Sequence, residues 1–246
     1  MTIWAIGDLH LSFSDPAKNM EKINPHWEGH IDKIAQSWKD SVKADDLVLL
    51  PGDISWAMRW PDALHDLEWI DRLPGQKVMI KGNHDHWWPS QAKLQRDLPS
   101  SIVALYQSAF SWRGLAIGGS RLWDSPSFSF VEYIDWAGER EPQQQERTSL
   151  LFERELIRLR RSLEGLDPHA HHRLVMTHYP PLGPDHAPSP VTDLFEEFDI
   201  EVALFGHLHN LKASTPPFGS VRGITYHCVA SDYLGFALKK IPIGEE

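Results

Sequence analysis

Eight side chains able to hold a metal ion or to transfer a proton follow short apolar runs in this sequence. The clearest run, Val78-Met79-Ile80, is typical of a buried strand; it breaks at Gly82, and Asn83 and His84 follow at once. Loops just past the carboxyl ends of such strands are where open α/β sheets place their chemistry. The same arrangement recurs in five loops, which together carry Asp8, His10, Asp53, Asn83, His84, His178, His207 and His209.

These donors point to metal chemistry because all of them are carboxylate, amide or imidazole groups. Such ligands suit Mn, Fe, Zn, Ni or Mg, whereas the lack of thiolates argues against a soft-metal or cluster site. A site for two ions needs about seven or eight donors with one bridging carboxylate, so one of the eight residues stays free for acid–base work. The sequence has 14 histidines, and the inference therefore depends on recurrence over five loops rather than on any single histidine.

The elements that position these loops can be placed from the spacing of apolar residues. Runs of strand type precede the loops at residues 3–6, 47–50, 78–80, 174–176 and 202–205. Apolar residues three or four positions apart predict helices over residues 30–42, 61–72, 89–98, 143–163 and 191–198. We therefore expect an α/β fold in which strands and helices alternate.

The remaining segments are less regular. A strand over residues 115–117 is expected to end in a tight turn at Gly118-Gly119, and residues 121–142 indicate a long surface loop or lid. Residues 224–230 and 235–238 predict a closing hairpin. Because the motif loops extend from Asp8 to His209, we expect residues 1–246 to form a single domain.

Charge restricts the partners that we expect. The 246 residues carry a formal net charge of −10, which argues against binding of long nucleic acid or of an anionic membrane surface. A small anionic substrate stays compatible with that charge, since bound cations would invert the local field. The oligomeric state cannot be predicted from this sequence.

Cellular location is inferred from three further features. Cys228 is the single cysteine, so no disulfide can form within the chain, which suits a reducing compartment. The first residues show no basic segment followed by a long apolar stretch, and we expect no signal peptide. No run of about 18 apolar residues occurs, so we expect no membrane span and a cytoplasmic location.

Five short blocks of this sequence resemble those of the calcineurin-like metallophosphoesterases. The blocks occur in the family's order between residues 7 and 209, and each follows an apolar run. Each block alone is a weak signal, but five in order are highly specific. The resemblance implies the family's four-layer α/β/β/α sandwich. The blocks are Asp8-Leu9-His10, Gly52-Asp53, Gly82-Asn83-His84-Asp85, Thr177-His178 and Gly206-His207-Leu208-His209.

The resemblance also implies a dinuclear metal centre, with Mn as the first choice of ion in vitro. A metal-bound hydroxide would attack the phosphorus of a phosphate ester, and His84, the catalytic residue, would assist the leaving group. Carried over position by position, the first ion is bound by Asp8, His10 and His209, the second by Asn83, His178 and His207, and Asp53 bridges the two.

Departures from the family's pattern narrow the substrate class. Ile54-Ser55-Trp56 follow Gly52-Asp53 where protein Ser/Thr phosphatases carry Asp-Arg-Gly, so their phosphate-clamping arginine is missing. Asp85 stands where those enzymes usually have glutamate. A phosphodiesterase, phosphomonoesterase (phosphatase) or pyrophosphohydrolase acting on a small molecule is favoured instead, and its substrate-binding residues are unknown. Asp85 could hold the loop or cap it.

An alternative is a non-catalytic metal-binding scaffold of the same fold that acts in protein–protein interaction. Every ligand position is filled here, which disfavours that hypothesis. Arginines near the rim could clamp a second phosphate, although a solvated face is favoured. Tryptophans on or near the rim could stack on a base or an apolar leaving group, although packing beneath the loops is favoured. These residues are Arg59, Arg121, Arg140, Trp56, Trp60, Trp87, Trp88, Trp123 and Trp136.

Overall fold

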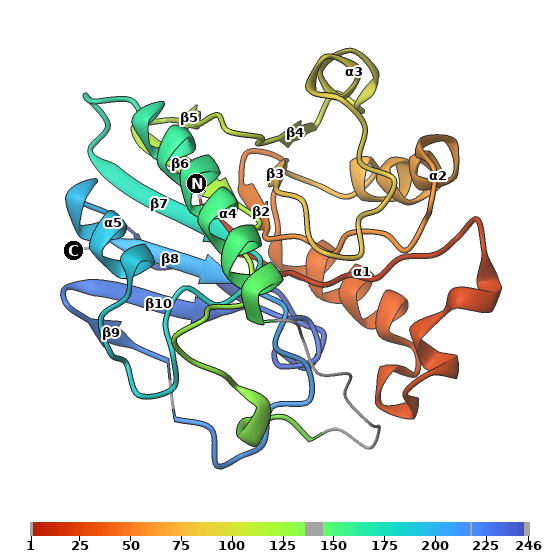
Figure 1. Ribbon diagram of the computed structural model, residues 1–246. Helices are drawn as coiled ribbons and strands as arrows, with labels where there is room; N and C mark the ends of the chain where they lie inside the picture. Colours follow the sequence, from red (N-terminus) through yellow and green to blue (C-terminus); the bar gives the residue numbers. More distant parts are fainter. Residues whose placement is uncertain (1, 136–144, 217, 244–246) are drawn as a thin grey trace.

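Two β-sheets pack face to face in the computed structural model, and helices cover the outer face of each sheet (Figure 1). The structure describes residues 2–135, 145–216 and 218–243, with no account of the side chains of residues 145 and 146. Trp136, Arg140 and the end of the predicted lid over residues 121–142 therefore lie outside the described residues.

The first sheet contains the strands that precede the first three motif loops. Its order is β11-β1-β2-β3-β4, and every neighbouring pair is parallel except β1 with β11. The strands are β1 (Ile3–Ala5), β2 (Leu47–Leu50), β3 (Gln76–Met79), β4 (Ile102–Ala104) and β11 (Lys239–Lys240). Its outer face is covered by helices α1 (His30–Ser41), α2 (Trp60–Asp71) and α3 (Gln91–Asp97).

The second sheet contains the strands that precede the last two motif loops. Its order is β5-β6-β7-β8-β10-β9, parallel in the centre and antiparallel at both edges. The strands are β5 (Phe110–Trp112), β6 (Leu115–Ser120), β7 (His172–Thr177), β8 (Val202–Phe205), β9 (Ser220–Val221) and β10 (Ile224–Cys228). Its outer face is covered by helices α4 (Gln145–Glu164) and α5 (Pro190–Glu197).

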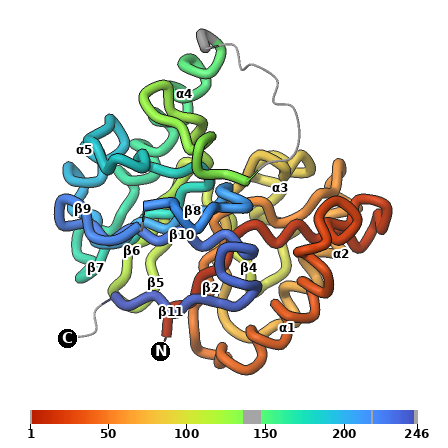
Figure 2. Tube along the Cα trace, turned by 90° about the horizontal axis from the view of Figure 1, so that it is seen from below, coloured from red at the N-terminus to blue at the C-terminus, as the bar shows by residue number. Residues whose placement is uncertain are grey.

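Side chains alternate between two cores along each central strand. Leu47 and Leu49 of β2 point between the sheets, whereas Val48 and Leu50 pack under α1 and α2. Because both faces of these strands are buried, their sequences are continuous apolar runs. One core lies between the sheets and one lies under each helical layer, which gives the four-layer α/β/β/α sandwich predicted from the sequence (Figure 2).

The tight turn predicted at Gly118-Gly119 is wrong. Both glycines lie inside β6 and are fully buried. A Cβ atom on Gly118 would lie 2.9 Å from Cδ2 of Leu163 in α4, and one on Gly119 would lie 2.5 Å from the carbonyl oxygen of Met176 in β7. The glycines are therefore needed for close packing of a helix and a strand rather than for a turn.

The closing hairpin predicted over residues 224–230 and 235–238 is also wrong. β10 ends at Cys228 and pairs with β8 and β9, while β11 pairs with β1 of the other sheet. The segment between β10 and β11 crosses from one sheet to the other through turns. Residues 235–238 form no strand, and strand propensity in the sequence does not identify the partner of the strand that follows them.

Short 3-10 helices complete the connections, at Pro16–Lys18, Met20–Lys22, Pro25–Trp27 and Val131–Tyr133. Of the helices in the described ranges, none combines the length and the apolar character required to cross a bilayer.

Candidate metal centre

The parallel strands bring all five motif loops to one edge of the sandwich. The loops after β1 and β2 run side by side, since the amide of Asp8 donates to the carbonyl of Gly52 (3.0 Å) and the amide of His10 to that of Asp53 (3.0 Å). The loop after β8 reaches across from the other sheet, where the amide of His207 donates to the carboxylate of Asp8 (3.0 Å). The two sheets therefore share one site.

The backbone at this edge is strained. Asp8, His10, Asp53 and His207 have φ angles of 57°, 46°, 51° and 69°. This left-handed region is uncommon for residues other than glycine, and strained positions of this kind concentrate at functional sites. Glycines make the close packing possible, because a Cβ atom on Gly82 would overlap the carboxylate of Asp53 and one on Gly206 would overlap that of Asp8.

One cluster of donors is formed by Asp8, His10 and His209, whose candidate ligand atoms lie within 4.8 Å of one another. Nε2 of His10 is 3.1 Å from Nε2 of His209, which in turn is 3.4 Å from Oδ1 of Asp8. Nδ1 of His209 donates to Asp232 at 2.8 Å. That hydrogen bond leaves the Nε2 lone pair of His209 directed at the cluster.

A second cluster lies beside the first and is formed by Asn83, His178 and His207. Oδ1 of Asn83 is 2.6 Å from Nε2 of His178 and 3.0 Å from Nδ1 of His207. Nδ1 of His178 donates to the carbonyl of Pro51 at 3.0 Å, so its Nε2 faces the cluster. Oδ2 of Asp53 is 3.4 Å from Nε2 of His178 and 3.8 Å from Nε2 of His10, which places this carboxylate between the clusters.

These separations fit the coordination of two cations. Ligands held about 2.0–2.2 Å from a common ion lie about 3.0–3.5 Å from one another. Within each cluster, lone pairs of oxygen and imidazole nitrogen face each other, an arrangement that is repulsive until a cation or a proton lies between them. The donor set therefore suits divalent ions that accept oxygen and nitrogen ligands.

The protonation of the two clusters reflects this excess of electron pairs. Burial alone would lower the pKa of His178, but the charges of Asp53 and Asp8 outweigh it and raise that pKa to about 9. Burial is likewise outweighed at His209, where Asp232 and Asp8 hold the pKa well above its usual range. Each of these protons occupies a position where a cation would compete.

The other two histidine ligands behave differently. Burial lowers the pKa of His10 and that of His207 well below the usual value, so both rings are neutral. The carboxylate of Asp53 is also buried, yet the positive charge on His178 holds its pKa well below the ordinary range. Asp53, which lies between the two clusters, therefore carries a negative charge.

His84 lies at the mouth of the site and is exposed. Its amide donates to Oδ1 of Asp53 at 2.8 Å, and its ring centroid lies 5.4 Å from that of His10 and 5.5 Å from the Trp56 ring. Partial desolvation lowers the pKa of this ring. The side chain is therefore near both clusters and open to an incoming molecule.

Asp232 contacts the candidate site, and sequence reasoning missed it. Its carboxylate accepts hydrogen bonds from Nδ1 of His209 and from the amide of Asn210, each at 2.8 Å. The signal was present, because Asp232 follows β10, which runs parallel to β8 and ends at the same edge. Assigning this segment to a hairpin turn concealed a sixth strand-end loop.

Asp85 and Trp56 support the motif loops. The buried carboxylate of Asp85 accepts hydrogen bonds from the amides of Ile54, Ser55 and Gly82 and from the Trp87 indole, and burial together with the charge of Asp53 raises its pKa to about 6. The indole N–H of Trp56 contacts Nδ1 of His10 and turns Nε2 of that ring toward His209.

The other rim residues divide by burial. Trp60 and Trp87 are buried beneath the loops, as expected, whereas Trp56, Trp88 and Trp123 are half-buried. The Arg59 side chain is exposed and pairs with Asp62 on its own helix, so it belongs to a solvated face. Arg121 does not belong to a solvated face, because its side chain lines a pocket between α3 and α4.

Comparison with known proteins identifies the family. The model of the family described as calcineurin-like phosphoesterase matches residues 1–211. The chain belongs to the calcineurin-like phosphoesterase family. The match covers all five motif loops and ends two residues beyond His209.

Curated relatives of this chain include two proteins from mycobacteriophages. It is 30% identical over 114 residues to the Gene 66 protein of Mycobacterium phage D29, covering 46% of this chain and 53% of the phage protein. It is 34% identical over 107 residues to the Gene 66 protein of Mycobacterium phage L5, covering 44% of this chain and 48% of the phage protein. The chain thus spans about half the length of these relatives.

Solved structures share the fold at low sequence identity. A protein of unknown function from Aquifex aeolicus, AQ665, aligns with a TM-score of 0.50 and 16% identity over 97% of this chain and 95% of its own. GAP50, the anchor in the inner membrane complex of Plasmodium, aligns with a TM-score of 0.50 and 11% identity over 94% of this chain and 72% of its own. At such identities the likeness concerns the fold alone.

Proposed function

We propose that this chain is a dinuclear metal-dependent phosphoesterase that hydrolyses a phosphodiester or phosphomonoester of a small molecule. The supporting observation is the convergence of seven donors: Asp8, His10 and His209 form one group, and Asn83, His178 and His207 lie beside it. The carboxylate of Asp53 lies within 4 Å of a histidine of each group, and His84 is exposed beside them. In this proposal, Asp8, His10 and His209 hold one ion and Asn83, His178 and His207 hold the other. Residues 1–246 act as a single domain in the cytoplasm.

When bound, two divalent ions would supply the positive charge that draws in a phosphate group and lowers the pKa of a water molecule. The chain's own residues set how much of that charge remains. Only Asp8 and Asp53 bring negative charge to the clusters, and Asn83 and the histidines are neutral donors. A positive centre would therefore remain in a protein whose formal net charge is −10.

His84 would act on the leaving group. Its ring is exposed and lies outside both clusters, so it is free to approach a bound phosphate ester. Desolvation lowers its pKa in the free protein, and the negative charge of an incoming phosphate would favour the protonated ring. The protonated ring could then donate to the departing oxygen.

The test combines metal content with turnover. Protein purified without chelators is analysed for bound metal and then assayed with an aryl phosphodiester and an aryl phosphomonoester in Mn²⁺, before and after chelation. We expect about two ions per chain and turnover of at least one ester that chelation abolishes. Two bound ions without turnover of either ester would instead favour the non-catalytic scaffold.

A variant at His84 separates chemistry from metal binding. Because His84 lies outside the donor clusters, His84→Gln should lower kcat by roughly 10²–10⁴-fold and leave the metal content unchanged. Loss of the ions together with activity would show that His84 maintains the clusters rather than acting on substrate. The control is His65→Gln, a change at an exposed histidine on α2.

A further inference from the structure

A second pocket opens at the same edge of the sandwich as the metal centre, between α3 and α4. Its volume is about 550 Å³, within the range of pockets that hold small ligands. Its walls come from segments that follow β3, β4 and β6, from the start of α3 and from one face of α4. The metal ligands themselves are absent from its lining.

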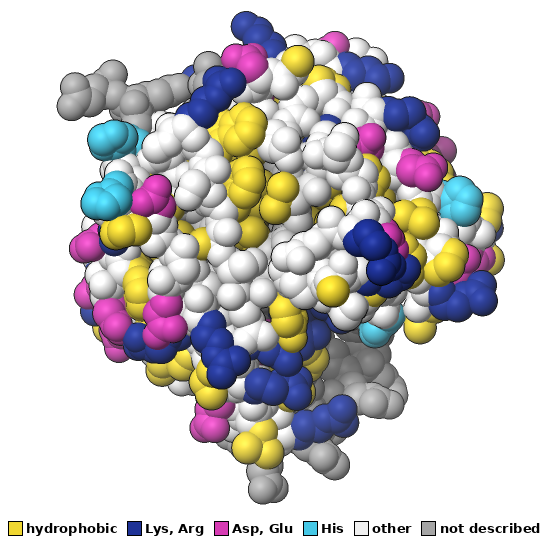
Figure 3. Space-filling view, turned by 90° about the horizontal axis from the view of Figure 1, so that it is seen from above, with side chains coloured by type: hydrophobic (Ala, Val, Ile, Leu, Met, Phe, Trp, Pro, Cys, Tyr) yellow, Lys and Arg dark blue, Asp and Glu magenta, His cyan; other side chains and the backbone are white. Residues whose placement is uncertain are grey.

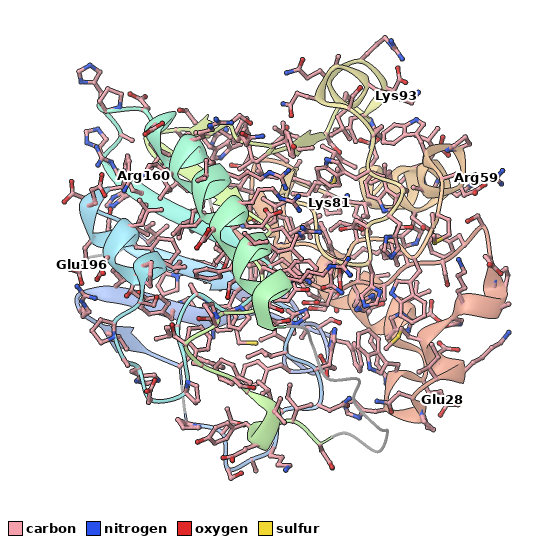
Figure 4. The ribbon with its side chains drawn as sticks, in the orientation of Figure 1. Glu28, Arg59, Lys81, Lys93, Arg160 and Glu196 are labelled. Carbon is pink, nitrogen blue, oxygen red and sulfur yellow. The ribbon has the colours of Figure 1, made fainter. Side chains whose placement is uncertain are left out.

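One side of this pocket is strongly cationic. Lys81 follows β3, Arg121 follows β6, and Arg154 and Arg158 lie one turn apart on α4. In Figure 4, Lys81 lies between α4 and the side of the molecule that carries α2 and α3, whereas Arg160 lies on the side of α4 that faces α5. Figure 3 looks onto this end of the molecule and shows Lys and Arg side chains gathered in its lower part.

These cations lack matching negative charge. Glu155 is the acidic residue of the lining, and its buried carboxylate is already shared by Arg121 (2.8 Å) and Arg158 (2.5 Å). Within the described ranges, Lys81 and Arg154 have no carboxylate within 4 Å. An excess of cations in a concave site of an acidic protein is an arrangement suited to a multiply charged anion.

Apolar and aromatic residues also line the pocket, and the guanidinium of Arg158 lies over the Tyr106 ring, 5.8 Å from its centroid. Trp88, Pro89 and Tyr106 are partly exposed there, above the buried side chains of Ile80 and Leu105. Such a wall suits a planar apolar group, because aromatic rings offer a face for stacking. The cationic and the aromatic residues together would recognise a molecule that carries both an anionic group and a planar group.

Unsatisfied polar atoms are a further, independent observation. Nε1 of Trp88, Oε1 of Gln91 and Nε of Arg121 are buried and lack a hydrogen-bond partner in the described part of the chain. All three residues line this pocket. Buried polar atoms usually have partners, so an occupant or ordered water is expected to supply them.

We propose that this pocket binds a small organic phosphate with a planar apolar body, of the nucleotide class, through Lys81, Arg121, Arg154 and Arg158. The site is distinct from the metal centre but coupled to it, since the carbonyl of Arg121 accepts hydrogen bonds from the amides of His178 (3.2 Å) and Tyr179 (3.0 Å). Binding does not require the hydrolytic activity proposed above.

The probe is α,β-methylene-ADP, whose bridge cannot be hydrolysed, titrated calorimetrically into the purified protein. We expect saturable binding that Arg154→Gln combined with Arg158→Gln weakens at least about tenfold, because each guanidinium donates charge-assisted hydrogen bonds to phosphate. Arg160→Gln is the matched control on the side of α4 that faces α5, where Arg160 pairs with Glu197, and should leave the Kd within about twofold. The single variant Arg154→Gln alters an exposed side chain and serves if the double variant fails to fold.

Two further arms locate the site and test its chemistry. Adenosine and inorganic pyrophosphate each fill one half of the pocket and should bind more weakly than the analogue. Pyrophosphate binding equal to the analogue would overturn the role of the apolar wall. The proposed site would be refuted if α,β-methylene-ADP did not bind at all. It would also be refuted if binding of the analogue were lost in His207→Ala but retained in the double variant. None of these outcomes depends on turnover, so they are separable from failure of the proposed hydrolysis.

Discussion

Replacement of Asp232 by asparagine tests the role of a side chain that touches no proposed substrate. Two N–H groups point at this carboxylate: Nδ1 of His209 reaches one oxygen and the amide of Asn210 reaches the other, each at 2.8 Å. An asparagine offers only one acceptor oxygen in the same place. One of the two donors would therefore face an NH₂ group.

The size of the effect follows from this geometry. The Asp232 side chain is 4% exposed, so water cannot readily repair the lost hydrogen bond. If Asn210 keeps the oxygen, His209 loses the acceptor that directs its Nε2 lone pair toward Asp8. Loss of such a supporting carboxylate typically lowers metal affinity by about 10–100-fold, or about 1.4–2.7 kcal/mol.

The assay is a calorimetric titration of Mn²⁺ into chelator-treated protein. We expect Asp232→Asn to weaken one of two binding events by that factor and to leave the other nearly unchanged, because Asp232 contacts only the cluster that contains His209. Asp193→Asn, which alters an exposed carboxylate on α5 that pairs with Arg222, is the control. Equal loss of both ions, or no change in either, would refute the proposed division into two clusters.

Further predictions concern stability. Asp85→Ala leaves four buried N–H groups without their acceptor and should lower the free energy of unfolding by about 3 kcal/mol or more in urea denaturation; a change below 1 kcal/mol would contradict this. Gly119→Ala should cost about 1–3 kcal/mol, since its Cβ would lie against β7, and an unchanged midpoint would count against it. Burial lowers the pKa of Lys77 from 10.5 to about 8, so the unfolded chain binds more protons above pH 8 and stability should rise by about 1 kcal/mol from pH 8 to 9 relative to Lys77→Met; parallel pH profiles would disprove it. Chelation should lower Tm if the ions bind the folded chain alone, and Mn²⁺ should restore it.

Sequence alone determined the ends of the central strands and the donors that follow them. Runs such as Leu47–Leu50 are apolar at every position because both faces of the strand are buried. The buried central strands can therefore be predicted without a structure. The residues that follow those strands indicated oxygen and nitrogen coordination. This inference was possible because each donor lies next to its strand in the chain. The four-layer arrangement came from resemblance to the family rather than from spacing.

Tertiary structure decided which side chains meet across the sheets. Asp232 supports His209, and Arg121 and Arg154 line one pocket, although these residues belong to separate elements. Position 119 requires a glycine because β7 packs against it there, and the sequence does not show that β7 is the neighbouring strand. Hydrophobic patterning records whether a residue is buried and with what period, but it carries no information on the partner it is buried against, and that choice is made only when the sheets and helices pack.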